Sequence, residues 1–372
     1  MLKKTTIALL VLTGLNVSAA KGGIIMAKDH INYKFGGRLM FDGAYYDDDK
    51  VDMQSGTEVR RARMYFAGKL KENWDFILQV DYAGNKSTIK AAHIGYSWNN
   101  SKLTLGNQLP PFSLQLQTSS KWQTFTTRAT PVLTLNPDNS FGLSYKTHSD
   151  KFFFKTGVYG GTASNSDSRE RFILGARLTT ARNLGKSLNH LGLSYLHTER
   201  EESAFKSSSE THVSGYSFID TDTISNRSSD RIAAEYAYVN GSLSAQAEYF
   251  LTDVRGKGLK KTSLDGYYGF VSWFATGDTR RYSKSSGAFG EIKPNKEFGK
   301  GGSGAIEIAA RYSSLDMTGK LNGGKQDNIA AELNWYPGGG LKFMLNHTMV
   351  SAEKDNDKDK PSITQFRAQV TF

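Results

Sequence analysis

The chain contains no cysteine, only 7 prolines in 372 residues, and no long apolar run after its first twenty residues. The lack of thiols excludes a disulfide-stabilised scaffold and any thiolate metal centre. An apolar fraction of 38% is too low for a bundle of membrane helices, each of which needs about 20 apolar residues. The chain has instead 37 glycines and 12% aromatic residues, a composition that favours many strands and turns.

Residues 1–20 have the pattern of a secretory signal. Lys3 and Lys4 precede an apolar core over 7–15, and small residues that include Ala20 follow it. We expect cleavage near Ala20 and a single mature domain over 21–372, with an ordinary buried N-terminal helix as the alternative. Because no further run is long enough for a spanning helix, the sequence predicts an exported protein that is either soluble or a β-barrel.

The last ten residues alternate strictly between apolar and polar side chains. Phe366, Ala368, Val370 and Phe372 are apolar, and polar residues such as Arg367 stand between them. Successive side chains of a strand point to opposite faces, so one face is apolar and the other is wet. A soluble sandwich shows the same period, but it would not turn charged side chains toward its core. The terminal aromatic residue resembles the C-terminal signal of outer-membrane barrels, so we expect the barrel-assembly machinery to recognise Phe372.

This period recurs and predicts the fold class: all-β, a 16-stranded antiparallel transmembrane β-barrel. The predicted strands lie near 31–46, 57–70, 73–82, 87–98, 101–106, 141–147, 151–160, 170–180, 188–200, 230–240, 242–254, 264–278, 304–315, 327–336, 340–351 and 362–372. Such barrels have an even strand number, with short turns at one end and long loops at the other. The connections follow this rule except 279–303, which is long and basic after an even strand. Either that turn is elaborated or the strand count slips there.

The connection 107–140, after the fifth strand, is long and shows no clear alternation. Loops of this length are usually functional or disordered, and the apolar residues in it argue against disorder. We predict that this third loop folds into the lumen as a constriction; a loop on the extracellular rim is the alternative. Lys121 would offer a point charge, Ser119 and Ser120 hydroxyl donors, and Arg128 a planar fork to phosphate oxygens.

Basic residues within the strands are expected to face the lumen, because Arg or Lys on the lipid face costs about 2–4 kcal/mol at the midplane. The alternation places inward Arg38, Arg61, Arg63, Lys69, Lys146, Lys155, Arg171, Arg177, Arg311 and Arg367. A cationic lumen concentrates anions and is the expected construction of an anion pore. The alternative is that these cations pair with inward Glu235, Glu248, Glu307 and Glu332. The chain after residue 20 keeps nine more basic than acidic residues, which favours the pore.

Several segments, in their order and spacing, resemble one family. They are Val59-Arg60-Arg61-Ala62-Arg63, Trp74-Asp75-Phe76, Val80-Asp81-Tyr82, Thr118-Ser119-Ser120-Lys121-Trp122, Phe274-Ala275-Thr276-Gly277-Asp278, Ala309-Ala310-Arg311-Tyr312-Ser313 and Asn334-Trp335-Tyr336-Pro337. The chain resembles the phosphate-selective porins (O and P type) of Gram-negative outer membranes. The resemblance implies a trimer with one pore per subunit and an anion site at the third loop. It assigns phosphate binding to Lys121, Ser119, Ser120, Arg61, Arg63 and Asp81. The chain departs from the family at Thr127, where an acid often precedes the loop arginine.

The sequence thus predicts an outer-membrane, anion-selective porin that passes phosphate, pyrophosphate or polyphosphate by passive, saturable diffusion. A general porin without phosphate selectivity is the rival reading. The seven histidines have no metal-ligand spacing and lie in no serine nucleophile motif, so we expect neither an enzyme nor a metal or other cofactor. Nucleic acid is not an expected partner, because Arg and Lys are spread over many strands. The expected partners are phosphate or related anions, outer-membrane lipid and two further copies of the chain.

Overall fold

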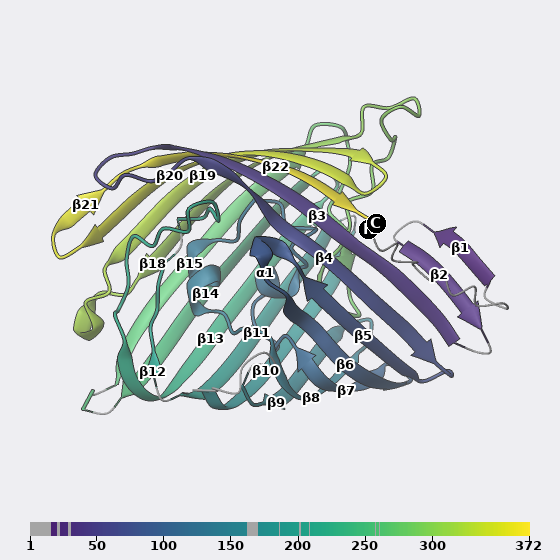
Figure 1. The fold of residues 1–372 in the computed structure, drawn as a ribbon, viewed down its shortest axis with the longest axis horizontal. Coiled ribbons are helices and arrows are strands. Elements are labelled where there is room, and N and C mark those ends of the chain that lie inside the picture. Colours follow the sequence, from purple (N-terminus) through teal and green to yellow (C-terminus); the bar gives the residue numbers. More distant parts are fainter. Residues whose placement is uncertain are drawn as a thin grey trace, which may run out of the picture.

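The computed structural model describes residues 16–20, 23–28, 31–161, 170–185, 187–200, 202–207, 209–256, 258–259 and 261–372. Sixteen antiparallel strands close into a barrel (Figure 1). They are β3 (Ile31–Asp47), β4 (Gly56–Leu70), β5 (Trp74–Asp81), β6 (Thr88–Trp98), β7 (Ser101–Gln108), β8 (Ser140–His148), β9 (Phe152–Tyr159), β10 (Glu170–Leu184), β11 (Ser187–Arg200), β13 (Ile224–Asn240), β14 (Leu243–Gly256), β15 (Thr262–Phe274), β18 (Ala305–Asp316), β19 (Lys325–Gly338), β20 (Leu341–Lys354) and β22 (Ser362–Thr371). The barrel closes where β22 pairs with β3, from Ser362 opposite Asp47 to Thr371 opposite Arg38.

The predicted fold class is therefore confirmed, and each predicted strand matches an observed one. The largest difference is at β13, which begins six residues before the predicted 230–240. Alternation also explains the wall: on β20, outward Leu345 and Met349 are about half exposed, whereas inward Asn346 and Thr348 are buried. The apolar outer face suits lipid and the polar inner face suits water.

The remaining elements are short. β1 (Asn16–Ala20) and β2 (Gly23–Lys28) continue the sheet beside the start of β3, while β12 (Glu202–Ser203) and β21 (Asp357–Asp359) extend neighbouring hairpins. β16 (Tyr282–Ser283) pairs with β17 (Ala288–Phe289). The helices are α1 (Leu114–Gln117), α2 (Thr130–Leu135), η1 (Ala83–Asn85) and η2 (Gly319–Leu321). No helix among the described residues is long and apolar enough to cross a membrane. Residues 1–15 of the predicted signal lie outside the described residues, and cleavage near Ala20 stays a prediction.

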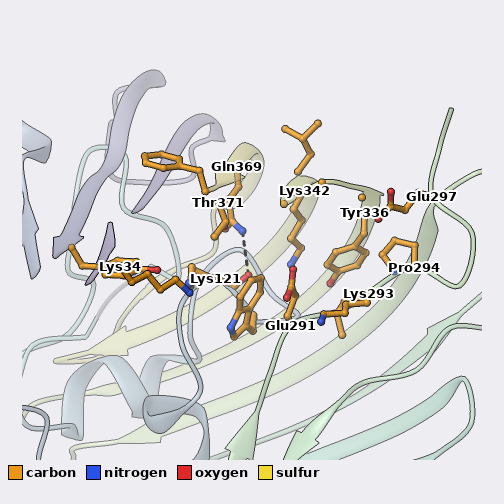
Figure 2. A pocket seen from close by; sticks show the side chains of 18 residues that line it. Lys34, Lys121, Glu291, Lys293, Pro294, Glu297, Tyr336, Lys342, Gln369 and Thr371 are labelled. Atoms are coloured by element: carbon orange, nitrogen blue, oxygen red, sulfur yellow. Dashed lines mark hydrogen bonds between the residues drawn. The ribbon is translucent and has the colours of Figure 1, made fainter. Parts of the chain in front are cut away.

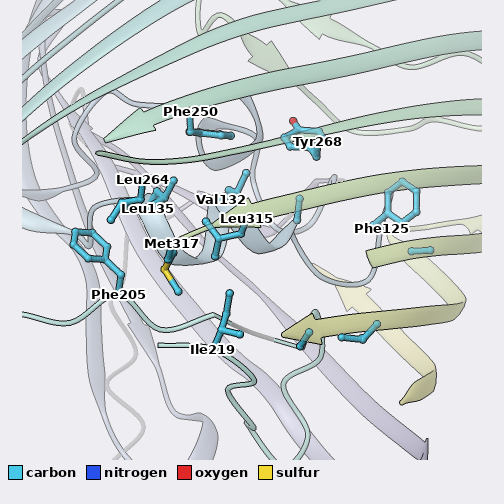
Figure 3. Packing of buried hydrophobic residues seen from close by; sticks show 14 of the residues in the cluster. Phe125, Val132, Leu135, Phe205, Ile219, Phe250, Leu264, Tyr268, Leu315 and Met317 are labelled. Carbon is cyan, nitrogen blue, oxygen red and sulfur yellow. The ribbon is translucent and has the colours of Figure 1, made fainter. Parts of the chain in front are cut away.

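Part of the barrel interior is a packed apolar core (Figure 3). Phe125, Val132 and Leu135 from the connection between β7 and β8 are buried there. The strands β14, β15 and β18 contribute buried side chains, among them Phe250, Leu264 and Leu315, and the connection between β11 and β13 adds Phe205 and Ile219. Strands on other sides of the barrel, such as β3, β11 and β20, also contribute buried residues to this core, so the lumen is not an evenly open cylinder.

The exceptional connection predicted at 279–303 is an elaborated turn, and the strand count does not slip. It runs over 275–304, between β15 and β18, and contains the β16–β17 hairpin. Phe289 is buried in a cluster with Leu114 of α1 and Ala237, an inward residue of β13. The Gly287 carbonyl accepts a hydrogen bond of 2.8 Å from the inward Arg177 side chain. This segment, the inserted turn, therefore enters the lumen from the end that carries the short turns.

Candidate functional site

The third loop lies inside the barrel, and buried carboxylates of the opposite wall hold its backbone. Glu248 accepts hydrogen bonds of 2.8 and 2.7 Å from the amides of Leu114 and Gln115. Glu332 accepts from the Thr126 amide and hydroxyl at 2.9 and 2.8 Å. An amide is a natural partner for a buried carboxylate, because the charge needs hydrogen-bond donors once it leaves water. These two glutamates therefore anchor the loop. The alternative interpretation of the sequence, that they pair with the lumenal cations, does not describe them.

Three of the predicted inward cations are paired with buried acids. Arg177 makes a two-point contact with Glu235, at 2.9 and 2.7 Å. Arg367 does the same with Asp42, at 2.6 Å for both bonds, and also donates to the Thr126 carbonyl. Arg311 pairs with Glu210 and donates to the Thr127 carbonyl at 2.8 Å. Their charges are locally compensated, so we assign these arginines to holding the lumenal segments.

A cationic cavity of about 560 Å³ lies between the third loop and the wall formed by β3–β9. Among the described residues that line it, eight are basic and one, Asp138, is acidic. The basic residues are Arg38, Arg61, Arg63, Lys90, Lys102, Arg128, Lys146 and Lys155. Ser119 and Ser120 line the same cavity from the loop. The structure therefore brings together most of the predicted anion-binding residues.

The lining of this cavity includes a cluster of arginines, two of which are oriented by Asp81 at the end of β5. Asp81 accepts bonds of 3.1 and 2.8 Å from Arg63 and one of 3.4 Å from Arg61. Arg38 on β3 donates to the Ser119 hydroxyl at 3.2 Å. Within the described part of the chain, the Arg38 Nε and the Ser120 hydroxyl are buried without a hydrogen-bond partner. Buried polar groups are rarely left unsatisfied, so these two donors mark a place for a ligand or water.

Lys121 lies outside the cavity that Ser120 and Arg128 share, although all three were expected in one site. The Lys121 side chain lines a second cavity, on the short-turn side of the cationic one. Burial, together with the charges of Arg38 and Lys34, lowers the pKa of Lys121 to about 8. Arg128 lines the cationic cavity, but its Nε and one terminal nitrogen donate to the loop carbonyls of Gln115 and Thr118, each at 3.1 Å. Its fork is thus partly occupied by the loop itself.

Sequence reasoning missed Arg60, Lys90 and Lys102. A β-bulge between Met40 and Phe41 of β3 breaks the alternation opposite Arg60, and the charge of Arg60 acts on inward Arg128 and Arg367. Lys102 stands directly opposite Lys146 and could have been found from the alternation. A second bulge lies opposite Gln79 and Val80 of β5, where Ala91 and Ile89 of β6 are paired and Lys90 between them is the extra residue.

The other predicted inward cations divide into three cases. Lys146 and Lys155 line the cationic cavity, and Lys155 donates to the Leu109 carbonyl at 2.9 Å. Lys69 is exposed near the short-turn end of β4. The Arg171 side chain lies outside the part of the molecule that the structure describes. The cationic wall is therefore made by β3–β9 together with the third loop.

The family model described as phosphate-selective porin O and P matches residues 31–372. The chain belongs to this family. Porin O of Pseudomonas aeruginosa is 24% identical to it over 96% of this chain and 92% of that protein. This porin is located in the outer membrane of a Gram-negative bacterium, and its family consists of channels and not enzymes. The short turns therefore face the periplasm and the long loops the cell exterior.

Solved structures support the fold of this porin. The anion-selective porin from Comamonas acidovorans has a TM-score of 0.60 at 15% identity, covering 92% of this chain and 100% of that one. OmpT, an outer membrane protein of Vibrio cholerae, in its trimer form has a TM-score of 0.55 at 11% identity, with 92% and 100% coverage. At these identities the likeness concerns the barrel and not the residues of the pore.

Proposed function

We propose that this porin is anion-selective and passes phosphate, or pyrophosphate and polyphosphate, by passive and saturable diffusion. The observation that carries the proposal is the cationic cavity, which eight basic side chains and one acid of the described residues line. Asp81 and Asp75 pair with three of the eight cations from behind, and two buried donors have no partner among the described residues. Arg38, Arg61 and Arg63 with Ser119 and Ser120 form the proposed binding site. Lys121 marks its periplasmic exit, and Arg128 stabilises the loop that carries the serines.

Electrostatics and hydrogen bonding act in sequence along the proposed path. The surplus of positive charge in a narrow, low-dielectric lumen raises the local anion concentration. At the cavity, guanidinium and hydroxyl donors replace part of the hydration shell of the oxyanion, in directions that suit phosphate oxygens. Asp81 orients Arg61 and Arg63 and offsets part of their charge. Because Asp81 weakens the binding without making it unfavourable, the anion can also leave the site, as conduction requires.

The assembly we propose is a homotrimer in outer-membrane lipid, as the trimer form of OmpT illustrates for a related barrel. The backbone of Phe372 exchanges hydrogen bonds of 2.8 and 3.2 Å with Gly37 of β3, which places the chain end at the seam of the barrel. Its side chain lies at the periplasmic rim, where the assembly machinery would meet an incoming chain. We include recognition of Phe372 by that machinery in the proposal.

Planar bilayers test the proposed function directly. In a KCl gradient, the reversal potential of the purified porin should have the sign that indicates a preference for chloride over potassium. Phosphate should block the chloride current at submillimolar concentrations. Arg61→Gln should weaken the block, whereas Lys261→Gln, which removes an exposed lysine paired with Asp253, should not. An anion preference without phosphate block would establish a general anion porin instead. Cation selectivity would overturn the proposal.

A further inference from the structure

The second cavity, of about 460 Å³, lies at the periplasmic end of the pore. The tip of the third loop, the inserted turn, the start of β3 and the chain end around Phe372 enclose it. Figure 2 shows Lys34 and Lys121 on one side of this exit cavity, with Lys342 and Tyr336 on the other. A cavity of this size matches the range of small-molecule sites, about 300–1,000 Å³.

Three lysines in the exit cavity each stand over an aromatic ring. The Lys121 ammonium is 4.9 Å from the ring centre of Trp122, and Lys342 is 4.9 Å from that of Tyr336. Lys34 is 6.0 Å from the ring centre of Tyr65. Throughout the described residues, none of the three lysines forms an ion pair with a carboxylate. A ring leaves the positive charge available, unlike a carboxylate, which would compensate it.

The other groups of the exit cavity restrict what it could hold. Lys293, Glu291 and Glu297 line it from the inserted turn, so that side carries charges of both signs. Lys342 is buried and donates to the Gln123 carbonyl at 2.7 Å, which leaves Lys34 and Lys121 as the more accessible ammonium groups. The surface thus combines a cationic side next to Trp122 with aromatic rings on several sides. Inorganic phosphate would use the cations but not the rings.

We propose that the exit cavity binds an organic anion that carries both an aromatic ring and a phosphate group, reached from the periplasm. The phosphate lies between Lys34 and Lys121, and the ring stacks on Trp122. Stacking of this kind adds about fivefold to affinity over an otherwise equal anion without a ring. A bound phosphate monoester blocks the exit of the pore. This site adds to the proposed passage of phosphate and requires only that the porin conducts ions.

The test compares two phosphate monoesters that differ in their ring, p-nitrophenyl phosphate and methyl phosphate, as blockers of chloride current. The full-length porin is inserted into a planar bilayer, and each ester is added to one side at a time. We expect p-nitrophenyl phosphate to block at a concentration about fivefold lower than methyl phosphate, from the periplasmic side only. Trp122→Leu should remove this difference, and Trp122→Phe, which keeps a ring, should retain it. Unitary conductance in KCl reports whether each variant has folded.

Equal block by the two esters would overturn this inference, as would an aryl preference that survives in Trp122→Leu or acts equally from both sides. Its failure is distinguishable from failure of the proposed function. If inorganic phosphate blocks the pore normally but the esters do not differ, the exit site fails alone. If inorganic phosphate does not block and the periplasmic aryl preference persists, phosphate selectivity fails and the exit site stands.

Discussion

The guanidinium of Arg63 donates two hydrogen bonds, of 3.1 and 2.8 Å, to a single carboxylate oxygen of Asp81, which lies directly opposite it on the neighbouring strand. The second Asp81 oxygen accepts from the Ala62 amide at 3.2 Å, so the carboxylate is fixed from two sides. An acid within an anion site lowers affinity by Coulomb repulsion, but it also fixes the direction of the arginines. Removal of the Asp81 charge with its shape kept separates these two effects.

Asp81→Asn keeps the shape of the side chain and removes its charge. We expect the phosphate concentration for half block to fall by about tenfold, because the local positive charge is no longer offset. The maximal phosphate flux should fall as well, since tighter binding slows release. Single-channel recordings with phosphate titration measure both quantities. A weaker block would mean that orientation of Arg61 and Arg63 matters more than charge; Asp253→Asn, at an exposed ion pair, is the matched control.

Arg38 should be needed for phosphate recognition beyond its charge. Its Nε is a buried donor that finds no partner among the residues that the structure describes, and another of its nitrogens bonds to Ser119. We expect Arg38→Gln to weaken phosphate block by about 10- to 100-fold, the usual range for a hydrogen bond to a charged group. Arg38→Lys should keep anion preference in KCl but lose most of the phosphate block, because an ammonium cannot reproduce the planar fork. Phosphate block retained in Arg38→Lys would contradict this assignment.

Anion preference should depend on pH through Lys121. Burial and neighbouring cations lower the pKa of Lys121 to about 8, so its positive charge is present below that value and is lost as the pH rises through it. Reversal potentials in KCl gradients should show anion preference declining between about pH 7 and 9, where an ordinary lysine with a pKa near 10.4 remains charged. Chloride is the suitable probe because its own charge does not change with pH.

Two variants check that this transition belongs to Lys121. Lys121→Gln should lower anion preference at pH 7 and reduce its change up to pH 9. Lys121→Glu should abolish the preference altogether, because it places an acid at the exit of the proposed site. A reversal potential that is unchanged in Lys121→Glu would show that the third loop does not set selectivity.

The inserted turn should depend on the buried pair of Arg177 and Glu235. Glu235→Gln leaves Arg177 buried without a countercharge, a change that costs about 3–5 kcal/mol of folding stability. Because Arg177 also bonds to the Gly287 carbonyl, protease cleavage within 275–304 should accelerate before the barrel unfolds. Limited proteolysis and thermal unfolding in detergent measure the two effects. Unchanged cleavage of the turn, with Lys261→Gln as reference, would show that this pair does not hold it.

The sequence predicted the barrel well because strand alternation is a local signal. Side chains two residues apart share a face, so the side that Arg38 or Lys146 occupies follows from its neighbours alone. Bulges defeat this reasoning, and Arg60 was missed for that reason. The ion-pair partners of the lumenal arginines could not be predicted from the sequence either. Asp42 and Arg367 are 325 residues apart, and no local pattern marks Glu210 as the partner of Arg311.

The division of the lumenal residues into two cavities was equally hidden from the sequence. Ser120 and Lys121 are adjacent, yet they line different cavities, because the loop turns between them. The inserted turn supplies the far wall of the exit cavity, and its path depends on contacts with α1 and β13 that only the folded molecule reveals. Pattern alone therefore predicted which side chains face the lumen but not how they group into cavities.

The apolar packing of Phe125, Val132 and Leu135 against Phe250, Leu264 and Leu315 gives this channel an interior scaffold like that of a water-soluble enzyme. The width of the pore is then set by contacts within the protein, and the surrounding bilayer has little effect on that width. A change of lipid chain length or lateral tension should alter how the barrel sits in its host membrane while leaving the aperture, and the solutes it admits, the same.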